Sequence, residues 1–168
     1  ATVRAACILK TGFCESVYAK TPGVESMQGP AHLAIGWLIG EAAGLRERRD
    51  RRIVGLSGLA PDIDVISYPL AYVAYGGDLG RAFSFYATVH HRYTHGVAFA
   101  ILCGAIAWWL ASQNRRGTVA ALAALAVLAH VVGDVVASGT GWPVYPFTPM
   151  NDVSWSVDWS WNASDWRN

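Results

Sequence analysis

The stretch TVAALAALAVLAHVVGDVVA, residues 118–137, decides how the rest of the chain is interpreted. It contains no proline and a single acidic residue, and its length approaches the roughly 20 residues that an apolar helix needs to cross a bilayer. A helix that is apolar on every face lies either in a protein core or in lipid. His130 and Asp134 are four residues apart and therefore share one face of this helix. Because polar side chains in such a run are costly without a partner, this pair predicts a functional site.

Three other segments show helical patterns, and the four together predict an all-α fold. They are residues 30–45, residues 53–75 with an interruption at Pro61, and residues 94–112. Hydrophobic residues make up 53% of the chain and charged residues only 15%, a more apolar balance than that of an average globular domain. We therefore expect a polytopic membrane bundle of about four helices with a metal site between them. A soluble helical bundle with an unusually apolar core is the alternative.

Composition divides the chain into three parts. Residues 1–26 are mixed and aperiodic, and we expect a leader or a segment outside the domain there, because Met27 directly precedes the first patterned segment. Residues 27–138 form the expected helical membrane domain with the metal site. Residues 139–168 are rich in tryptophan, and we expect an extracytoplasmic tail, truncated at its polar end.

Arginines mark two of the connections between the predicted helices. Five lie between the first and second segments and two between the third and fourth: Arg46, Arg48, Arg49, Arg51, Arg52, Arg115 and Arg116. Cytoplasmic loops of membrane proteins are enriched in lysine and arginine, so both connections are expected in the cytoplasm. This topology places His32 and the cluster at residues 90–95 at outer helix ends. His130 is about 18 Å along its helix, also in the outer half.

All five histidines lie near carboxylates in a way that predicts a metal site. They are His32, His90, His91, His95 and His130, and the carboxylates are Asp62, Asp64 and Asp134. Imidazole and carboxylate are ligands of zinc and of metals such as manganese. In the APDID segment we expect one aspartate to bind the metal and the other to cap a helix or to orient a ligand. The HHRYTH cluster leaves open whether His90 or His91 is the ligand, because only one of the two shares a helix face with His95.

Four motifs occur in an order that resembles a known family. They are MQGPAHLAIG (27–36), SGLAPDID (57–64), HHRYTHG (90–96) and HVVGDVVASGTGWPVYPF (130–147). Over about residues 27–149 the chain resembles the YdjM-like bacterial inner-membrane proteins, which are described as metal-dependent hydrolases and are distantly similar to the zinc phospholipase C and single-strand nuclease superfamily. The resemblance implies an all-α fold and metal ligands at His32, an aspartate of PDID, a histidine of HHRYTH, His130 and Asp134.

The chain departs from that family pattern at two points. The family motif usually places arginine directly after the first histidine and serine after the last, whereas here Arg92 is displaced and Gly96 stands in the serine position. No histidine follows His130, which argues against a three-zinc cluster. We therefore expect one or two divalent ions, zinc first and manganese as the alternative.

From these features we expect a membrane-embedded hydrolase at the bacterial inner membrane, multi-pass, with its site in the extracytoplasmic half. It would cleave a phosphoester of a lipid or lipid-linked substrate with a metal-activated water. The metal-ligand candidates are His32, Asp62, His90, His95, His130 and Asp134, and the catalytic candidates are Asp64, Arg92 and His91. Membrane lipid is the expected partner, and the net charge of +1 gives no reason to expect nucleic acid. The alternative is a non-catalytic membrane protein with a structural metal site or a path for metal ions or protons.

Overall fold

The computed structural model describes residues 29–137 and 142–157, and this part of the chain is helical. Its α-helices are α2 (Gly29–Ala42), α3 (Arg48–Leu59), α4 (Ser67–Ala74), α5 (Leu79–Val89), α6 (Val97–Leu110) and α7 (Arg116–Ala137), and its 3-10 helices are η1 (Ala60–Ile66) and η2 (Gln113–Arg115). Within the described residues, β pairing is limited to one antiparallel bridge between Val144 and Trp155. The predicted all-α class is confirmed. The predicted leader, residues 1–26, lies outside the described residues, as do parts of the predicted tail.

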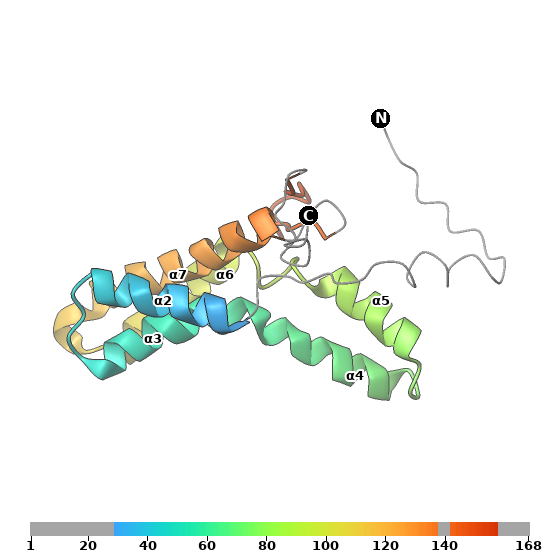
Figure 1. Ribbon diagram of the computed structural model, residues 1–168, viewed down its shortest axis with the longest axis horizontal. Coiled ribbons are helices and arrows are strands. Elements are labelled where there is room, and N and C mark those ends of the chain that lie inside the picture. The colour runs from blue at the N-terminus through green and yellow to red at the C-terminus, as the bar shows by residue number, and fades with distance from the viewer. Residues whose placement is uncertain (1–28, 138–141, 158–168) are drawn as a thin grey trace, which may run out of the picture.

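Two helical hairpins form a four-helix bundle (Figure 1). α2 packs against α3 and α6 packs against α7, and the hairpins meet mainly where α7 contacts α3 and α2. Glycines set the spacing of the first hairpin: a Cβ at Gly36 would lie 2.8 Å from the carbonyl oxygen of Val54, and one at Gly58 would lie 2.6 Å from that of His32. Both distances are too short for a real contact. Glycine at these two positions therefore lets α2 and α3 approach until their backbones touch.

Small side chains fill the centre of the bundle, and large apolar side chains face outward. Val54 of α3 and Val119, Ala123 and Ala126 of α7 are completely buried. Trp109 of α6, by contrast, is 77% exposed. Small residues between helices with large apolar residues outside are typical of helices that pack in lipid.

One segment of the described chain is long and apolar enough to cross a membrane on its own. It comprises Gln113–Ala137 and has a mean hydropathy of 2.2, whereas the apolar helix Val97–Leu110 is shorter. Length and composition thus identify a single candidate span among the described residues, where about four were expected.

The predicted helix over residues 53–75 is wrong in its bounds and its continuity. α3 begins at Arg48, so four of the arginines assigned to a loop lie within its first turns. Pro61 then stands at the start of the 3-10 helix η1, and the α-helix resumes only at Ser67. A proline lacks the N–H group that an α-helix needs, which explains why the chain changes helix type here. The change presents the PDID aspartates at the end of the bundle.

Helix α5 was not predicted from the sequence. Its N-cap is Asp78, whose carboxylate accepts a hydrogen bond from the backbone N–H of Arg81 at 3.0 Å. Gly76 and Gly77, with φ of +63° and +89°, form the turn from α4 to α5. The α4–α5 hairpin extends away from the bundle, on the side opposite the α2–α3 turn (Figure 1). The helix expected from residue 94 begins later, at Val97, and leaves residues 90–96 as a loop.

The two arginine-bearing turns lie at the same end of the bundle. Ser112, which follows α6, donates through its backbone N–H and its hydroxyl to Oδ1 of Asp50 in α3, at 3.2 Å in both cases. Asp50 is almost completely buried. This contact joins the α2–α3 turn to the α6–α7 turn. The histidine and aspartate motifs of α2, η1, the 90–96 loop and α7 lie towards the opposite end of the bundle.

Candidate metal centre

All five histidines and three carboxylates meet at the end of the bundle opposite the arginine turns. They are His32 of α2, Asp62 and Asp64 of η1, His90, His91 and His95 of the following loop, and His130 and Asp134 of α7. Every histidine of the cluster is buried, and so is Asp134. A buried set of imidazoles and carboxylates from four separate segments is therefore the main polar feature of the described structure.

Asp134 lies at the centre of this set. Its Oδ2 is 2.9 Å from Nε2 of His130, 3.4 Å from Nε2 of His95 and 3.8 Å from Nε2 of His91. Its Oδ1 is 3.4 Å from Nε2 of His32. Four histidines thus point the same ring nitrogen at one carboxylate.

Backbone carbonyls determine which nitrogen of two of these histidines carries the proton. Nδ1 of His130 lies 2.7 Å from the carbonyl oxygen of Gly58, and Nδ1 of His91 lies 3.3 Å from that of Trp142. Since a carbonyl oxygen only accepts, each Nδ1 must donate, and in the neutral ring Nε2 then keeps a free lone pair. This arrangement orients a histidine for metal binding through Nε2.

Asp64 orients the other two histidines of the loop. Its Oδ1 is 2.8 Å from Nδ1 of His90, and its Oδ2 accepts from the hydroxyl of Thr94 at 2.9 Å. The Thr94 oxygen is in turn 3.0 Å from Nδ1 of His95, which also lies 3.4 Å from Asp64 Oδ2. Burial alone would raise the pKa of Asp64, but the hydrogen bonds with His90 and His95 outweigh it and hold that pKa below its usual value. Asp64 is therefore ionised, and its carboxylate contacts the Nδ1 atoms of His90 and His95.

Nε2 of His130 and Nε2 of His95 are only 3.1 Å apart. In neutral rings with the proton on Nδ1, both atoms are acceptors that face the same carboxylate. Asp134 Oδ2 and His91 Nε2 are buried without a hydrogen-bond partner among the described residues. Electron-rich atoms packed this closely are unfavourable unless a cation lies among them. Ligands of a tetrahedral zinc ion with bonds of about 2.1 Å would be about 3.4 Å apart, close to the spacing found here.

The donor atoms fall into overlapping groups that fit one or two ions. Two groups share His130: one is His32, His130 and Asp134, and the other is Asp62, His95 and His130, with all ligand atoms in each group within 4.8 Å of one another. A third comprises His90, His91 and His95. The residues present therefore fit a divalent metal.

Asp62 differs from the other candidate ligands in its exposure. Its Oδ1 lies 3.5 Å from Nε2 of His130 and 3.9 Å from Nε2 of His95. Its side chain is nevertheless 29% exposed, while the histidine side chains it faces are completely buried. The carboxylate of Asp62 thus lies next to the buried histidines and is also partly accessible from the surface of the protein.

The tail covers the histidine loop. The backbone N–H of Tyr145 donates to the carbonyl of His91 at 2.9 Å, and that of Val97 donates to the carbonyl of Pro146 at 2.8 Å. A Cβ at Gly96 would lie only 2.6 Å from the Pro146 oxygen. A residue without a Cβ is thus required at position 96 by the close approach of the tail.

His91 is held in an unusual backbone conformation at this contact. Its φ of +62° lies in the left-handed region that non-glycine residues rarely adopt. Burial, together with the neighbouring His95 and His90, lowers the pKa of His91 to about 3, so its ring is neutral at physiological pH. A neutral imidazole with a free Nε2 is the form that binds metal ions.

Arg92 contacts the tail. Its guanidinium donates to Asp152 at 2.6 Å and lies 5.0 Å from the centre of the Tyr145 ring. The predicted role of Arg92 at a substrate phosphate stays a prediction, and the contact shown is with the covering segment.

Three parts of the site were not predicted from the sequence. Thr94 was not among the candidate site residues, although it lies inside the HHRYTHG motif and links Asp64 to His95. The Trp142 ring lies 5.7 Å from that of His90 and 6.1 Å from that of His91, and the WPVYPF stretch was the available signal. The Gly58 carbonyl has no sequence signal, because every residue carries such a group.

Comparisons with known proteins gave one match. The model of a family described as YdjM inner membrane protein matches residues 27–166, which include every residue of the cluster. Searches of curated proteins and of solved structures found no match.

Proposed function

Because this chain belongs to the YdjM inner membrane protein family, we propose that it is a membrane-embedded, metal-dependent hydrolase of phosphoesters. The observation that carries the proposal is the environment of Asp134: a buried carboxylate oxygen without a hydrogen bond, facing the Nε2 atoms of three histidines. Such a donor set is stable with a cation among its members.

The orientation we propose has the arginine turns in the cytoplasm and the cluster in the extracytoplasmic half of the membrane. Positive loops favour the cytoplasmic side, and the Ser112–Asp50 contact joins both such turns at one end of the bundle. α2 has 14 residues, about 21 Å, which is shorter than the roughly 30 Å hydrocarbon core. The α4–α5 hairpin beyond the cluster exposes Leu70, Val73 and Leu79 at 65%, 77% and 61%, and it would occupy the rest of the outer leaflet. A substrate would then be a lipid or a lipid-linked phosphoester.

The metal would be held by Asp134, His32, His130 and His95, with zinc as our first choice and one or two ions bound. A divalent ion in such a site lowers the pKa of a bound water and polarises a phosphoryl oxygen. Asp64 and the Gly58 carbonyl would keep the Nε2 atoms of the histidines unprotonated and correctly oriented.

The chain's own groups suggest how a proton would be handled in the hydrolysis. Hydrolysis forms a bond from phosphorus to the water oxygen and breaks the P–O ester bond, so a base must accept the water's proton and a proton must reach the departing alcohol. Asp64 is engaged by His90, Thr94 and His95, so it would act through the rings it orients. Asp62, which is partly exposed, would accept the proton. Arg92 would have to leave Asp152 to reach a phosphate.

The experiment is a hydrolysis assay on the purified full chain loaded with zinc or manganese. The substrates are phosphatidic acid, a phospholipid and a polyprenyl phosphate in mixed micelles, with phosphate or head-group release as the readout. We expect turnover that Asp62→Asn reduces by at least roughly 100-fold, as for loss of a general base, and that the exposed control Asp78→Asn leaves unchanged. A metal-loaded protein that releases nothing from any of these substrates would refute the hydrolase.

The burial of the cluster favours a second candidate, a structural metal site. Ligands such as His95 and His130 are completely buried, and structural zinc sites are closed by protein ligands. Water-proton relaxation of the manganese-loaded chain separates the two. A catalytic site retains an exchangeable water on the ion, whereas a closed structural site gives no enhancement.

A further inference from the structure

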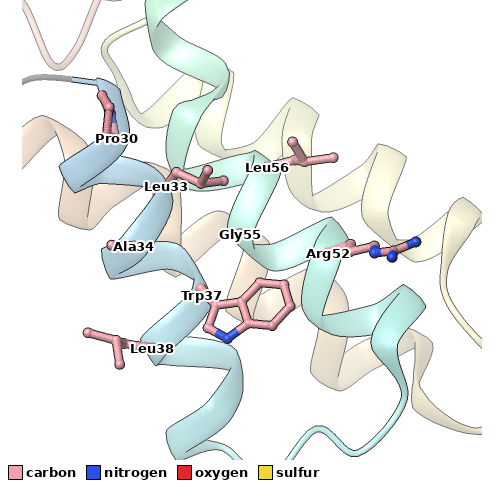
Figure 2. Close-up of a pocket in the computed structure, with 8 residues that line it drawn as sticks. All are labelled: Pro30, Leu33, Ala34, Trp37, Leu38, Arg52, Gly55 and Leu56. Carbon is pink, nitrogen blue, oxygen red and sulfur yellow. The ribbon is translucent and has the colours of Figure 1, made fainter.

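A long apolar groove lies between α2 and α3, on the outside of the bundle (Figure 2). Its volume is about 580 Å³, and Leu33, Trp37 and Leu38 of α2 and Leu56 of α3 are among the residues that line it. Trp37 and Leu33 point towards α3 across the groove (Figure 2). Arg51 makes a cation–π contact with Trp37, with its guanidinium 5.4 Å from the centre of the indole ring. The same guanidinium forms an ion pair with Glu41.

A second apolar groove runs along the other side of α3, against α6. Its volume is about 400 Å³, and it is lined by Ile53, Phe99, Ile106 and Leu110, among others. Leu56 lines both grooves and is 59% exposed. The two grooves therefore flank one exposed stripe of α3, which carries Leu56.

An exposed cation lies on that stripe, one helical turn before Leu56. Arg52 lines the first groove, and it has no ion pair or hydrogen bond within the part of the chain that the structure describes. Asp50, the nearest acid in the sequence, is buried and bonded to Ser112. An unpaired guanidinium at one of two neighbouring apolar grooves matches a ligand with one anionic head and two apolar chains.

We propose that α3 binds one anionic diacyl phospholipid, with its phosphate on Arg52 and one acyl chain in each groove. The family places this surface in a membrane, where phospholipid is the molecule that surrounds an apolar face. Arg52 lies in the second turn from the arginine end of the bundle, where a guanidinium reaches the level of lipid phosphates. The site uses none of the metal-cluster residues, and Arg52 lies towards the other end of the bundle, so phosphate binding there is separate from the proposed hydrolysis.

Quenching of Trp37 fluorescence by brominated lipid tests this proposal. The full chain, purified in detergent and stripped of lipid, is titrated with phosphatidylglycerol or phosphatidylcholine brominated in the acyl chains. Titration of Trp37→Phe in parallel isolates the contribution of Trp37 from those of the other tryptophans. We expect saturable quenching with phosphatidylglycerol at about five- to tenfold lower concentration than with phosphatidylcholine, the preference that one arginine provides.

Arg52→Gln should abolish that preference, whereas Arg49→Gln, an exposed arginine of the same helix that lines neither groove, should retain it. Ala34→Leu, which fills the first groove, should weaken the quenching by both lipids. If Arg49→Gln and Arg52→Gln lost the preference for phosphatidylglycerol equally, the proposal would be overturned in favour of diffuse charge attraction. Equal quenching by both lipids in the wild type, or concentration-dependent dimerisation that removes the quenching, would overturn it as well. Metal content should be unchanged in all these variants, so the outcome is independent of the hydrolase.

Discussion

Replacement of Asp134 by asparagine is the most direct test of the metal centre. The substitution keeps the size of the side chain but removes the charge that faces four histidine Nε2 atoms at 2.9 to 3.8 Å. Zinc binding by folded protein sites is worth about 10–16 kcal/mol, which over four ligands is about 2.5–4 kcal/mol each. Loss of one ligand should therefore weaken zinc binding by roughly 10²–10³-fold.

The assay is competition for zinc with a chromogenic chelator, combined with thermal unfolding in detergent. At zinc concentrations of about 100 times Kd the wild type gains about 2.7 kcal/mol, which raises Tm by about 5–10 °C for a chain of this size. Asp134→Asn should lose that metal-dependent rise. The control is Asp152→Asn, which removes a carboxylate that pairs with Arg92 instead of the histidines.

A specific result would refute the reasoning. If Asp134→Asn bound zinc within threefold of the wild-type affinity, Asp134 would not be a ligand. A fall in Tm that is the same with and without zinc would instead identify Asp134 as a hydrogen-bonding residue of the helix core.

Three further variants test the surroundings of the centre. Asp64→Asn should lower metal affinity about 10–100-fold in the same competition assay, because the residue orients histidines without being placed among the ligand groups; a loss as large as that of Asp134→Asn would contradict this distinction. Gly96→Ser should destabilise the chain by about 1–3 kcal/mol, measured as a lower unfolding temperature, since its Cβ would collide with the carbonyl of Pro146; an unchanged Tm would show that the tail does not rest on this loop. Arg92→Gln should change the free energy of unfolding by less than about 1 kcal/mol, because the ion pair of Arg92 with Asp152 is largely exposed. In this variant, limited proteolysis should cut the tail faster than in the wild type. An unchanged cleavage rate would count against the tail contact.

The fold was predictable where one physical signal dominated. Residues 118–137 are apolar throughout and lack a helix breaker, and the structure places α7 at Arg116–Ala137. α5 was missed because its sequence, LGRAFSFYATV, mixes aromatic, small and charged residues and contains no long apolar run. The start of α3 was placed too late because a run of arginines resembles a loop, although arginine is a good helix former.

The residues of the candidate site could be predicted from the sequence, but their arrangement in space could not. Histidine and aspartate in short motifs indicated which residues carry the chemistry, and these residues do meet in one cluster. Which of His90 and His91 faces Asp134 depended on backbone conformation. A φ of +62° at His91 directs its Nε2 towards Asp134, while Nδ1 of His90 contacts Asp64.

The sequence by itself determined the all-helical class, the family and the identity of the polar residues, because each follows from local composition and motif order. Only the tertiary structure decided which nitrogen of each histidine faces the centre. That choice depends on acceptors such as the carbonyls of Gly58 and Trp142, which are far away in the chain and carry no side-chain signal. The close approach of α2 to α3 at Gly36 and Gly58, and the tail that rests on Gly96, bring these acceptors into place. Distances of this kind arise from packing between segments, which no local pattern encodes.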